Sequence, residues 1–138
     1  MAYAEKDFQS AFNRWLKFNW VDGSAGFELK ITKKKSLPFS RVEMHQLQSL
    51  LDVKHGALIY KISDQSIGFK PFDSFILMDA PAFVVIMYYK PRKQKRVCLI
   101  DVDKFIDEMN ECDRRSLTEE RAEEIAEMVI DLNDIEIT

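Results

Sequence analysis

The sequence contains only two cysteines, Cys98 and Cys112, and their spacing matches neither a metal-ligand motif nor a redox motif. It also lacks an apolar run of the roughly 18–20 residues that a membrane-spanning helix requires. The first residues contain no basic and apolar leader. These absences argue against a membrane protein. They favour a reducing compartment, which we expect to be the cytoplasm, or the host cytoplasm for a phage-encoded chain.

The length of 138 residues suits one domain with one core, over residues 1–138. Some segments repeat apolar residues at helical spacing, and others alternate apolar with polar residues. Residues 82–89 are apolar almost throughout and rich in β-branched and aromatic side chains, which is typical of a central strand. The pattern predicts an α/β fold in which helices flank a mixed sheet. We expect helices over residues 4–18, 41–54, 102–109 and 118–132, and strands over residues 27–32, 57–62, 72–78, 82–89 and, at an edge, 97–100.

The starts of two expected helices carry capping signals. Ser40 followed by Glu43 forms a capping-box pattern before the second helix. Ser116 or Thr118 is suited to begin the last helix, which lies in an acidic helical segment at about residues 102–138.

Charge is divided unevenly along the chain. Residues 1–97 contain 16 basic and 9 acidic side chains, whereas residues 98–138 contain 4 and 14. A basic body of this kind indicates a surface for a polyanion, or else ordinary surface lysines beside a solvated acidic helix. Charge alone does not choose between these two interpretations.

The expected strand at residues 27–32 places Glu28 and Lys30 on the same face, because alternate side chains of a strand point the same way. A carboxylate can hold Mg²⁺, and a neighbouring lysine can orient the attacking water or offset charge on a phosphate during phosphodiester hydrolysis. The pattern E-x-K is nevertheless common and also describes an ordinary exposed ion pair. Its context therefore decides how it is interpreted.

That context is Phe27-Glu28-Leu29-Lys30-Ile31-Thr32, then Ser36-Leu37-Pro38-Phe39, then His45-Gln46. Over about residues 5–90 it resembles the PD-(D/E)xK nuclease superfamily, and within it the RecU-type and archaeal or phage-type Holliday junction resolvases. The resemblance implies a restriction-endonuclease-like fold and a homodimeric endonuclease of DNA recombination and repair. It implies Mg²⁺, with Mn²⁺ as a substitute, and cleavage of branched DNA. Glu28, Lys30 and Gln46 would then be catalytic residues, and Glu28 also a metal ligand. His45 is either part of the site or a partly buried structural histidine.

The resemblance leaves the second metal carboxylate open. In the family an aspartate usually precedes the E-x-K strand by ten or more residues, whereas here Asp22 lies close to that strand, in an Asp-Gly pair typical of a turn. We favour Asp73, in Lys70-Pro71-Phe72-Asp73, because this segment resembles the entrance to the aspartate strand of related nucleases. Glu5 is a further metal-ligand candidate, or a surface glutamate of the first helix.

Basic residues follow the predicted catalytic strand directly. Lys33, Lys34 and Lys35, together with Lys70, are candidates for contacts with DNA phosphates. The basic residues at 90–96, taken alone, indicate a solubilising turn. The alternatives to a resolvase are a restriction-type or repair-type endonuclease and a non-catalytic nucleic-acid-binding or assembly protein of the same fold. An interaction module with an incidental E-x-K pattern is the least favoured.

Overall fold

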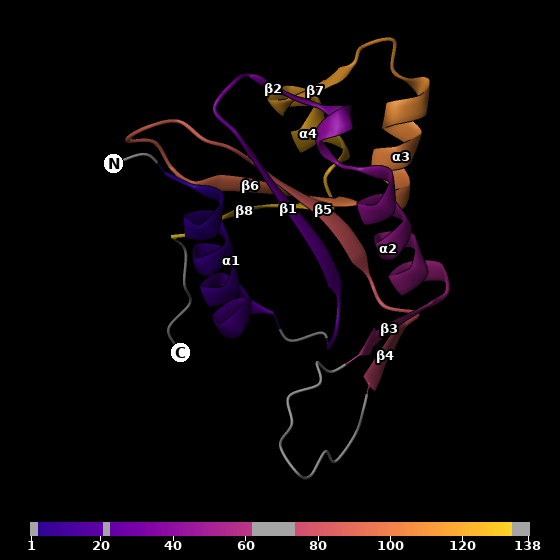
Figure 1. Ribbon diagram of the computed structural model, residues 1–138. Helices are drawn as coiled ribbons and strands as arrows, with labels where there is room; N and C mark the ends of the chain where they lie inside the picture. The colour runs from indigo at the N-terminus through magenta and orange to yellow at the C-terminus, as the bar shows by residue number, and fades with distance from the viewer. Residues whose placement is uncertain (1–2, 21–22, 62–73, 134–138) are drawn as a thin grey trace.

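Strand β5 (Ala82–Tyr88) forms the centre of the molecule, and each of its residues is buried. The computed structural model describes residues 3–20, 23–61 and 74–133, and gives the backbone only for residues 58–61 and 74–78. Beside β5 lie β1 (Gly26–Thr32) on one side and β6 (Arg96–Asp101) on the other, with β8 (Met128–Asp131) beyond β6 (Figure 1). The predicted α/β fold with a mixed sheet flanked by helices is confirmed.

The register of the sheet determines which ends of the strands meet. Strands β1 and β5 run parallel, with Gly26 opposite Ala82 and Thr32 opposite Tyr88. Strand β6 runs antiparallel to both β5 and β8. The segments after β1 and β5 therefore leave the sheet at one end, and the segment after β6 leaves at the other.

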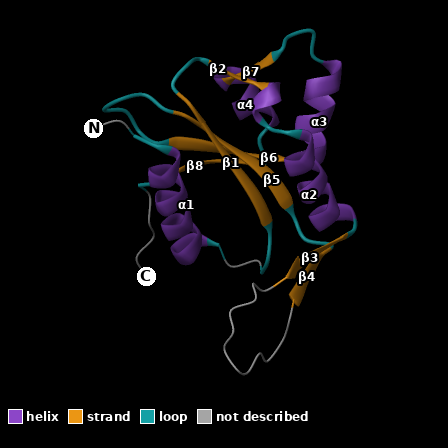
Figure 2. Cartoon of the chain, in the orientation of Figure 1, coloured by secondary structure: helices purple, strands orange, loops and turns teal. Residues whose placement is uncertain are grey.

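Helices cover both faces of the sheet (Figure 2). Helix α1 (Glu5–Asn19) packs Phe8, Phe12 and Trp15 on one face. The other face is covered by α2 (Met44–His55), α3 (Val102–Glu111) and the short α4 (Glu119–Ile125), which form a second apolar cluster. The alternation of β5 divides its residues between these clusters: Phe83, Val85 and Met87 face α1, whereas Val84, Ile86 and Tyr88 face α2.

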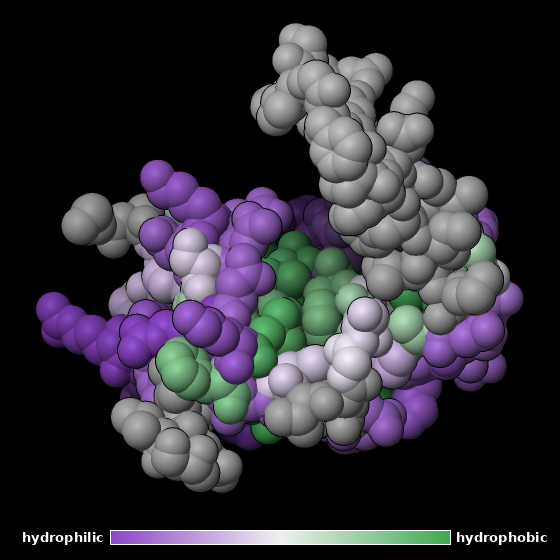
Figure 3. Space-filling model, turned by 90° about the horizontal axis from the view of Figure 1, so that it is seen from below, coloured by the Kyte–Doolittle hydropathy of each residue, from purple (hydrophilic) through white to green (hydrophobic). Residues whose placement is uncertain are grey.

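The cover on the α1 side of β1 is incomplete. Phe27, Leu29 and Ile31 are only partly buried, although they pack against the cluster beneath α1. Seen from below, apolar side chains gather in the middle of the surface, with hydrophilic side chains around them (Figure 3). The apolar face of β1 therefore remains in part accessible to solvent.

Two short antiparallel pairs complete the fold. Strand β2 (Ser36–Pro38) pairs with β7 (Ser116–Thr118), and β3 (Ala57–Lys61) pairs with β4 (Ser74–Met78). The prediction that Ser40 caps the second helix is wrong, because Ser40 lies in the 3₁₀ turn η1 (Phe39–Arg41). The backbone N–H of Phe39 donates to Arg115 O at 3.0 Å and its ring is buried against Phe105, so tertiary contacts hold this segment away from α2.

The acidic segment near the C-terminus differs most from the prediction. Thr118 caps α4 by accepting from Arg121 N, as expected, but α4 ends at Ile125 instead of continuing to residue 132. The N–H of Glu127 donates to Leu99 O at 2.8 Å, and β8 follows along β6. Two further predictions are therefore wrong: residues 97–100 are not an edge strand, and the segment after residue 102 is helical only in part.

Candidate functional site

The two faces of β1 separate its chemistry from its packing. Glu28 and Lys30 point to the side covered by α2, while the alternating apolar residues point to the α1 side. This is the arrangement predicted from the period of two. Because α2 packs over the polar face of β1, the charged side chains of this face are only partly accessible to solvent. Lys30 is 12% exposed and Glu28 is 27% exposed.

Three side chains that the sequence analysis assigned to catalysis meet on this face. The Gln46 amide donates from Nε2 to Glu28 Oε1 at 2.8 Å, and Lys30 Nζ lies 3.4 Å from the same oxygen. Gln46 comes from α2, 18 residues further along the chain than Glu28. Tertiary packing of α2 on β1 therefore builds the cluster, which a single strand would not provide.

The first turn of α2 holds the Gln46 amide in place. The Glu43 backbone N–H donates to Gln46 Oε1 at 2.9 Å, which forms the reciprocal bond of a capping box. With Oε1 acting as acceptor for Glu43, the amide group of Gln46 presents Nε2 to Glu28. The Glu43 carboxylate in turn lies 3.2 Å from His45 Nδ1, although both side chains are largely exposed. Glu43 therefore orients Gln46 through its backbone.

A cleft of about 330 Å³ opens beside this cluster, between β1 and α2. Gly26, Glu28, His45 and Gln46 line it together with apolar residues of α2. Gly26 allows the close approach of the helix, since a Cβ there would lie 3.3 Å from a methyl carbon of Val53. The cleft therefore combines one carboxylate, one amide, one imidazole and the Ser49 hydroxyl with the apolar side chains of Phe27, Leu50 and Val53.

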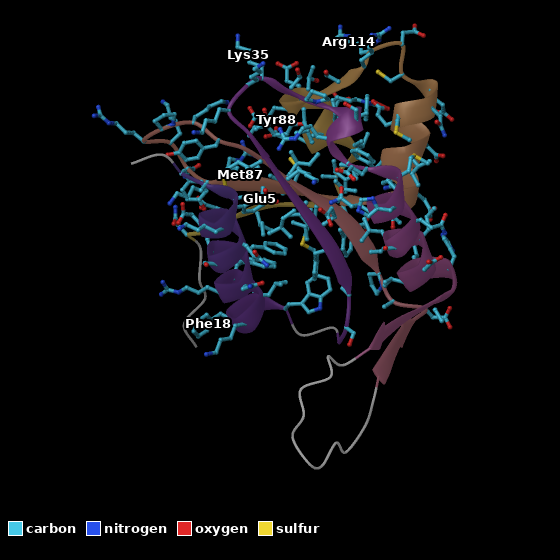
Figure 4. The ribbon with its side chains drawn as sticks, viewed as in Figure 1. Glu5, Phe18, Lys35, Met87, Tyr88 and Arg114 are labelled. Atoms are coloured by element: carbon cyan, nitrogen blue, oxygen red, sulfur yellow. The ribbon has the colours of Figure 1, made fainter. Side chains whose placement is uncertain are left out.

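The other predicted site residues are placed as follows. Asp22, Lys70 and Asp73 lie outside the described residues. Glu5 lies in the first turn of α1, on the face of the sheet opposite to Glu28, so the structure does not bring these carboxylates together (Figure 4). Lys33, Lys34 and Lys35 lie exposed in the loop after β1.

A magnesium ion commonly binds proteins through one or two carboxylates, with water and substrate phosphate as its remaining oxygen ligands. Glu28 offers one such carboxylate, and both contacts that the described residues make with it fall on Oε1. Within residues 3–20, 23–61 and 74–133 there is no group of three or more His, Cys, Asp or Glu side chains that would hold a metal. Glu28 therefore has the chemistry of one Mg²⁺ ligand, and the described residues place no further carboxylate beside it in the cleft.

A second charged cluster, which the sequence analysis missed, lies at the other end of α2. Lys54 Nζ is 2.7 Å from Asp101 Oδ1 and 2.6 Å from Asp103 Oδ2, and His55 Nε2 also contacts Asp103. The hydrogen bond from Lys54 holds the pKa of Asp103 below its usual value. Burial alone would lower the pKa of Lys54, but its hydrogen bonds to the two aspartates outweigh burial and raise it. These residues join α2 to the start of α3, and no local sequence signal pairs residues so far apart.

No protein-family model, no curated protein and no solved structure matches this chain. In the described part of the chain, no helix has both the length and the apolar character needed to cross a membrane.

Proposed function

We propose that this chain is a metal-dependent, structure-selective DNA endonuclease with a restriction-endonuclease-like fold, which resolves Holliday junctions by hydrolysing phosphodiester bonds. The observation that carries the proposal is the contact of Glu28 with both Lys30 and Gln46 beside the cleft. These residues come from two elements, β1 and α2, and the sequence pattern predicts each of them as a site residue. An incidental surface ion pair would not require a largely shielded lysine together with an oriented amide.

Glu28, Lys30 and Gln46 would have different roles in the reaction. Glu28 would hold Mg²⁺ together with Asp73 or Asp22, and the bound ion would supply Lewis-acid stabilisation of the phosphate and activation of water. Lys30, which is almost buried, would orient the attacking water or offset the charge that builds up on the phosphate oxygens. Gln46 would keep the Glu28 carboxylate in one orientation, because the Glu43 backbone fixes its own amide.

The test is cleavage of a labelled four-way junction by the purified protein in Mg²⁺, in Mn²⁺ and in EDTA. We expect nicking in either metal and none in EDTA. Glu28→Gln and Lys30→Met should each reduce the rate by at least about a hundredfold, since removal of one group that stabilises developing charge typically costs 10²–10³-fold. Lys104→Met, in α3 and outside the residues that line the cleft, is the control and should cleave at the parental rate. Parental rates for both site variants would end the proposal.

The same experiment separates the substrate alternatives. Competition between the junction and a linear duplex of equal length distinguishes a resolvase from a restriction-type or repair-type enzyme. A homodimer belongs to the same proposal and is supported by the partly exposed apolar face of β1. Light scattering in solution, with and without the junction, measures that state directly.

A non-catalytic DNA-binding protein is the second candidate. The observation that favours it is the presence of only one carboxylate, Glu28, in the cleft as the described residues form it. Salt-sensitive binding of the junction without cleavage in any divalent metal would support this candidate over the nuclease.

A further inference from the structure

We propose that the loop after β1 and the turn between β5 and β6 together form a second surface that binds DNA phosphates, apart from the cleft. The surface, which we call the basic end, consists of Lys33, Lys34, Lys35, Arg92, Lys93 and Lys95. It rests on the proposed function, because it assigns to that substrate the place where the duplex is held. The sequence alone favoured a solubilising turn for residues 90–96.

The topology of the sheet brings these two segments to one place. Strands β1 and β5 are parallel neighbours, Thr32 lies opposite Tyr88, and the N–H of Tyr89 donates to Thr32 O at 2.8 Å. The chain therefore leaves both strands at the same end of the sheet, and both basic loops begin there (Figure 1). About 55 residues of sequence separate the segments, so no local pattern predicts the combination.

The charges of the basic end are uncompensated by ion pairs with the described residues. Lys90 and Arg96, at the base of the turn, are paired with Glu119 at 2.7 Å and Glu123 at 3.3 Å, both from α4. The six residues of the basic end make no such ion pair in the described part of the chain. All but Lys95, whose Nζ lies over the Tyr3 ring at 4.9 Å from its centroid, are exposed. Cations that are free of protein ion pairs can neutralise DNA phosphates, and the DNA then releases its condensed counterions.

The backbone at Arg92 gives independent support. Pro91 and Arg92 form the centre of a turn in which Lys93 N–H reaches Lys90 O at 3.3 Å, and Arg92 has a φ of 62°. A positive φ at this position favours glycine, because a Cβ is strained there. A strained conformation in a surface turn is grounds for a functional hypothesis. Here the residue that bears the strain is a cation at the tip of the turn.

The spacing along β1 suits one duplex bound at both places. Lys33 follows Lys30 by three residues, or about 10 Å of extended strand. The same length corresponds to about three nucleotides at 3.4 Å per nucleotide of one strand. A DNA strand whose phosphate lies at Lys30 would therefore reach the beginning of the basic end within a few nucleotides.

Binding of a fluorescent four-way junction in EDTA, titrated at several KCl concentrations, tests the inference without any cleavage. The variant is Arg92→Gly with Lys93→Ala, where glycine suits the positive φ and keeps the turn folded. The matched control is Lys17→Ala with Lys104→Ala, which removes the same charge at the opposite end of the sheet. We expect the variant to bind more weakly than the control. The slope of log K against log salt is negative, and its magnitude should decrease by about 1.8, or about 0.9 for each lost phosphate contact.

A further variant is designed to strengthen DNA binding, by removing the α4 carboxylates that pair with basic residues at the base of the turn. Glu119→Gln with Glu123→Gln releases Lys90 and Arg96 from their ion pairs, and we expect tighter binding with a steeper salt slope. Equal affinities and slopes for the Arg92 and Lys93 variant and its control would overturn the inference, while junction cleavage by the parent would leave the proposed nuclease intact. A parent that binds no DNA at low salt would overturn both.

Discussion

Replacement of Lys54 by methionine tests how α2, which carries Gln46, is held to the rest of the fold. Methionine keeps most of the aliphatic length of lysine but removes the ammonium group that contacts Asp101 at 2.7 Å and Asp103 at 2.6 Å. Asp101 also caps α3 by accepting from the N–H groups of Asp103 and Lys104. The substitution therefore leaves two neighbouring carboxylates without their shared cation at a helix start.

The expected loss of stability follows from the burial of this cluster. A hydrogen bond to a charged group contributes about 1.5–3 kcal/mol when well buried, whereas an exposed ion pair contributes about 0.2–1 kcal/mol. Lys54 is 28% exposed, and Asp101 and Asp103 are 20% and 40% exposed. We therefore expect the free energy of unfolding to fall by about 2 kcal/mol, or the melting temperature by about 6–8 °C for a chain of this size.

The effect should depend on pH with a definite sign. Because the hydrogen bond from Lys54 lowers the pKa of Asp103, this carboxylate stabilises the fold above its ordinary pKa of 3.8. That contribution is lost as the pH falls through the lower pKa of the folded state. The difference between the parent and Lys54→Met should be constant at neutral pH, should narrow in acid, and should narrow again in alkali as the pH rises through the raised pKa of Lys54.

Urea unfolding followed by circular dichroism, at neutral pH and in steps below about pH 5, measures both effects. The control is Lys104→Met, because Lys104 lies 3.7 Å from Glu127 and both side chains are more than half exposed. It should change stability by no more than about 0.5 kcal/mol. The reasoning is refuted if Lys54→Met is as stable as this control, or if its deficit does not shrink in acid.

Three further outcomes follow from the structure. Burial raises the pKa of Cys98 to about 12. A thiol reagent should therefore modify only the half-buried Cys112 in the native protein, and both cysteines after unfolding. Mass spectrometry locates the label, and rapid labelling of Cys98 in the native protein would contradict this expectation. Tyr88→Phe removes the buried bond from the Tyr88 hydroxyl to Leu117 O at 2.8 Å and should cost about 1–2 kcal/mol in chemical denaturation. Arg92→Gly should raise stability by about 1 kcal/mol while weakening DNA binding, and a lower melting temperature would show that its positive φ is not strained.

Local patterns determined much of this fold. The alternation in β1 and the apolar run of β5 each follow from side chains that must divide between a core and solvent, so the sequence predicts them directly. The same alternation placed Glu28 and Lys30 on one face. The end of α4 was not predictable in this way: Ile125, Met128, Val129 and Leu132 form an apolar stripe at helical spacing, and only the pairing of β8 with β6 makes Met128 and Val129 part of a strand.

Long-range contacts decided the rest. The Gln46 amide reaches Glu28 because α2 packs on β1, with Gly26 permitting the close approach. The turn at residues 90–96 lies at the same end of the sheet as Lys33, Lys34 and Lys35, because β1 and β5 are parallel neighbours that end at the same level. The sequence shows which residue types alternate or repeat over short distances, and this is enough to predict which side chains share the polar face of one strand. Which distant segments share an edge depends on strand order and register, and these are set by the burial of the whole core.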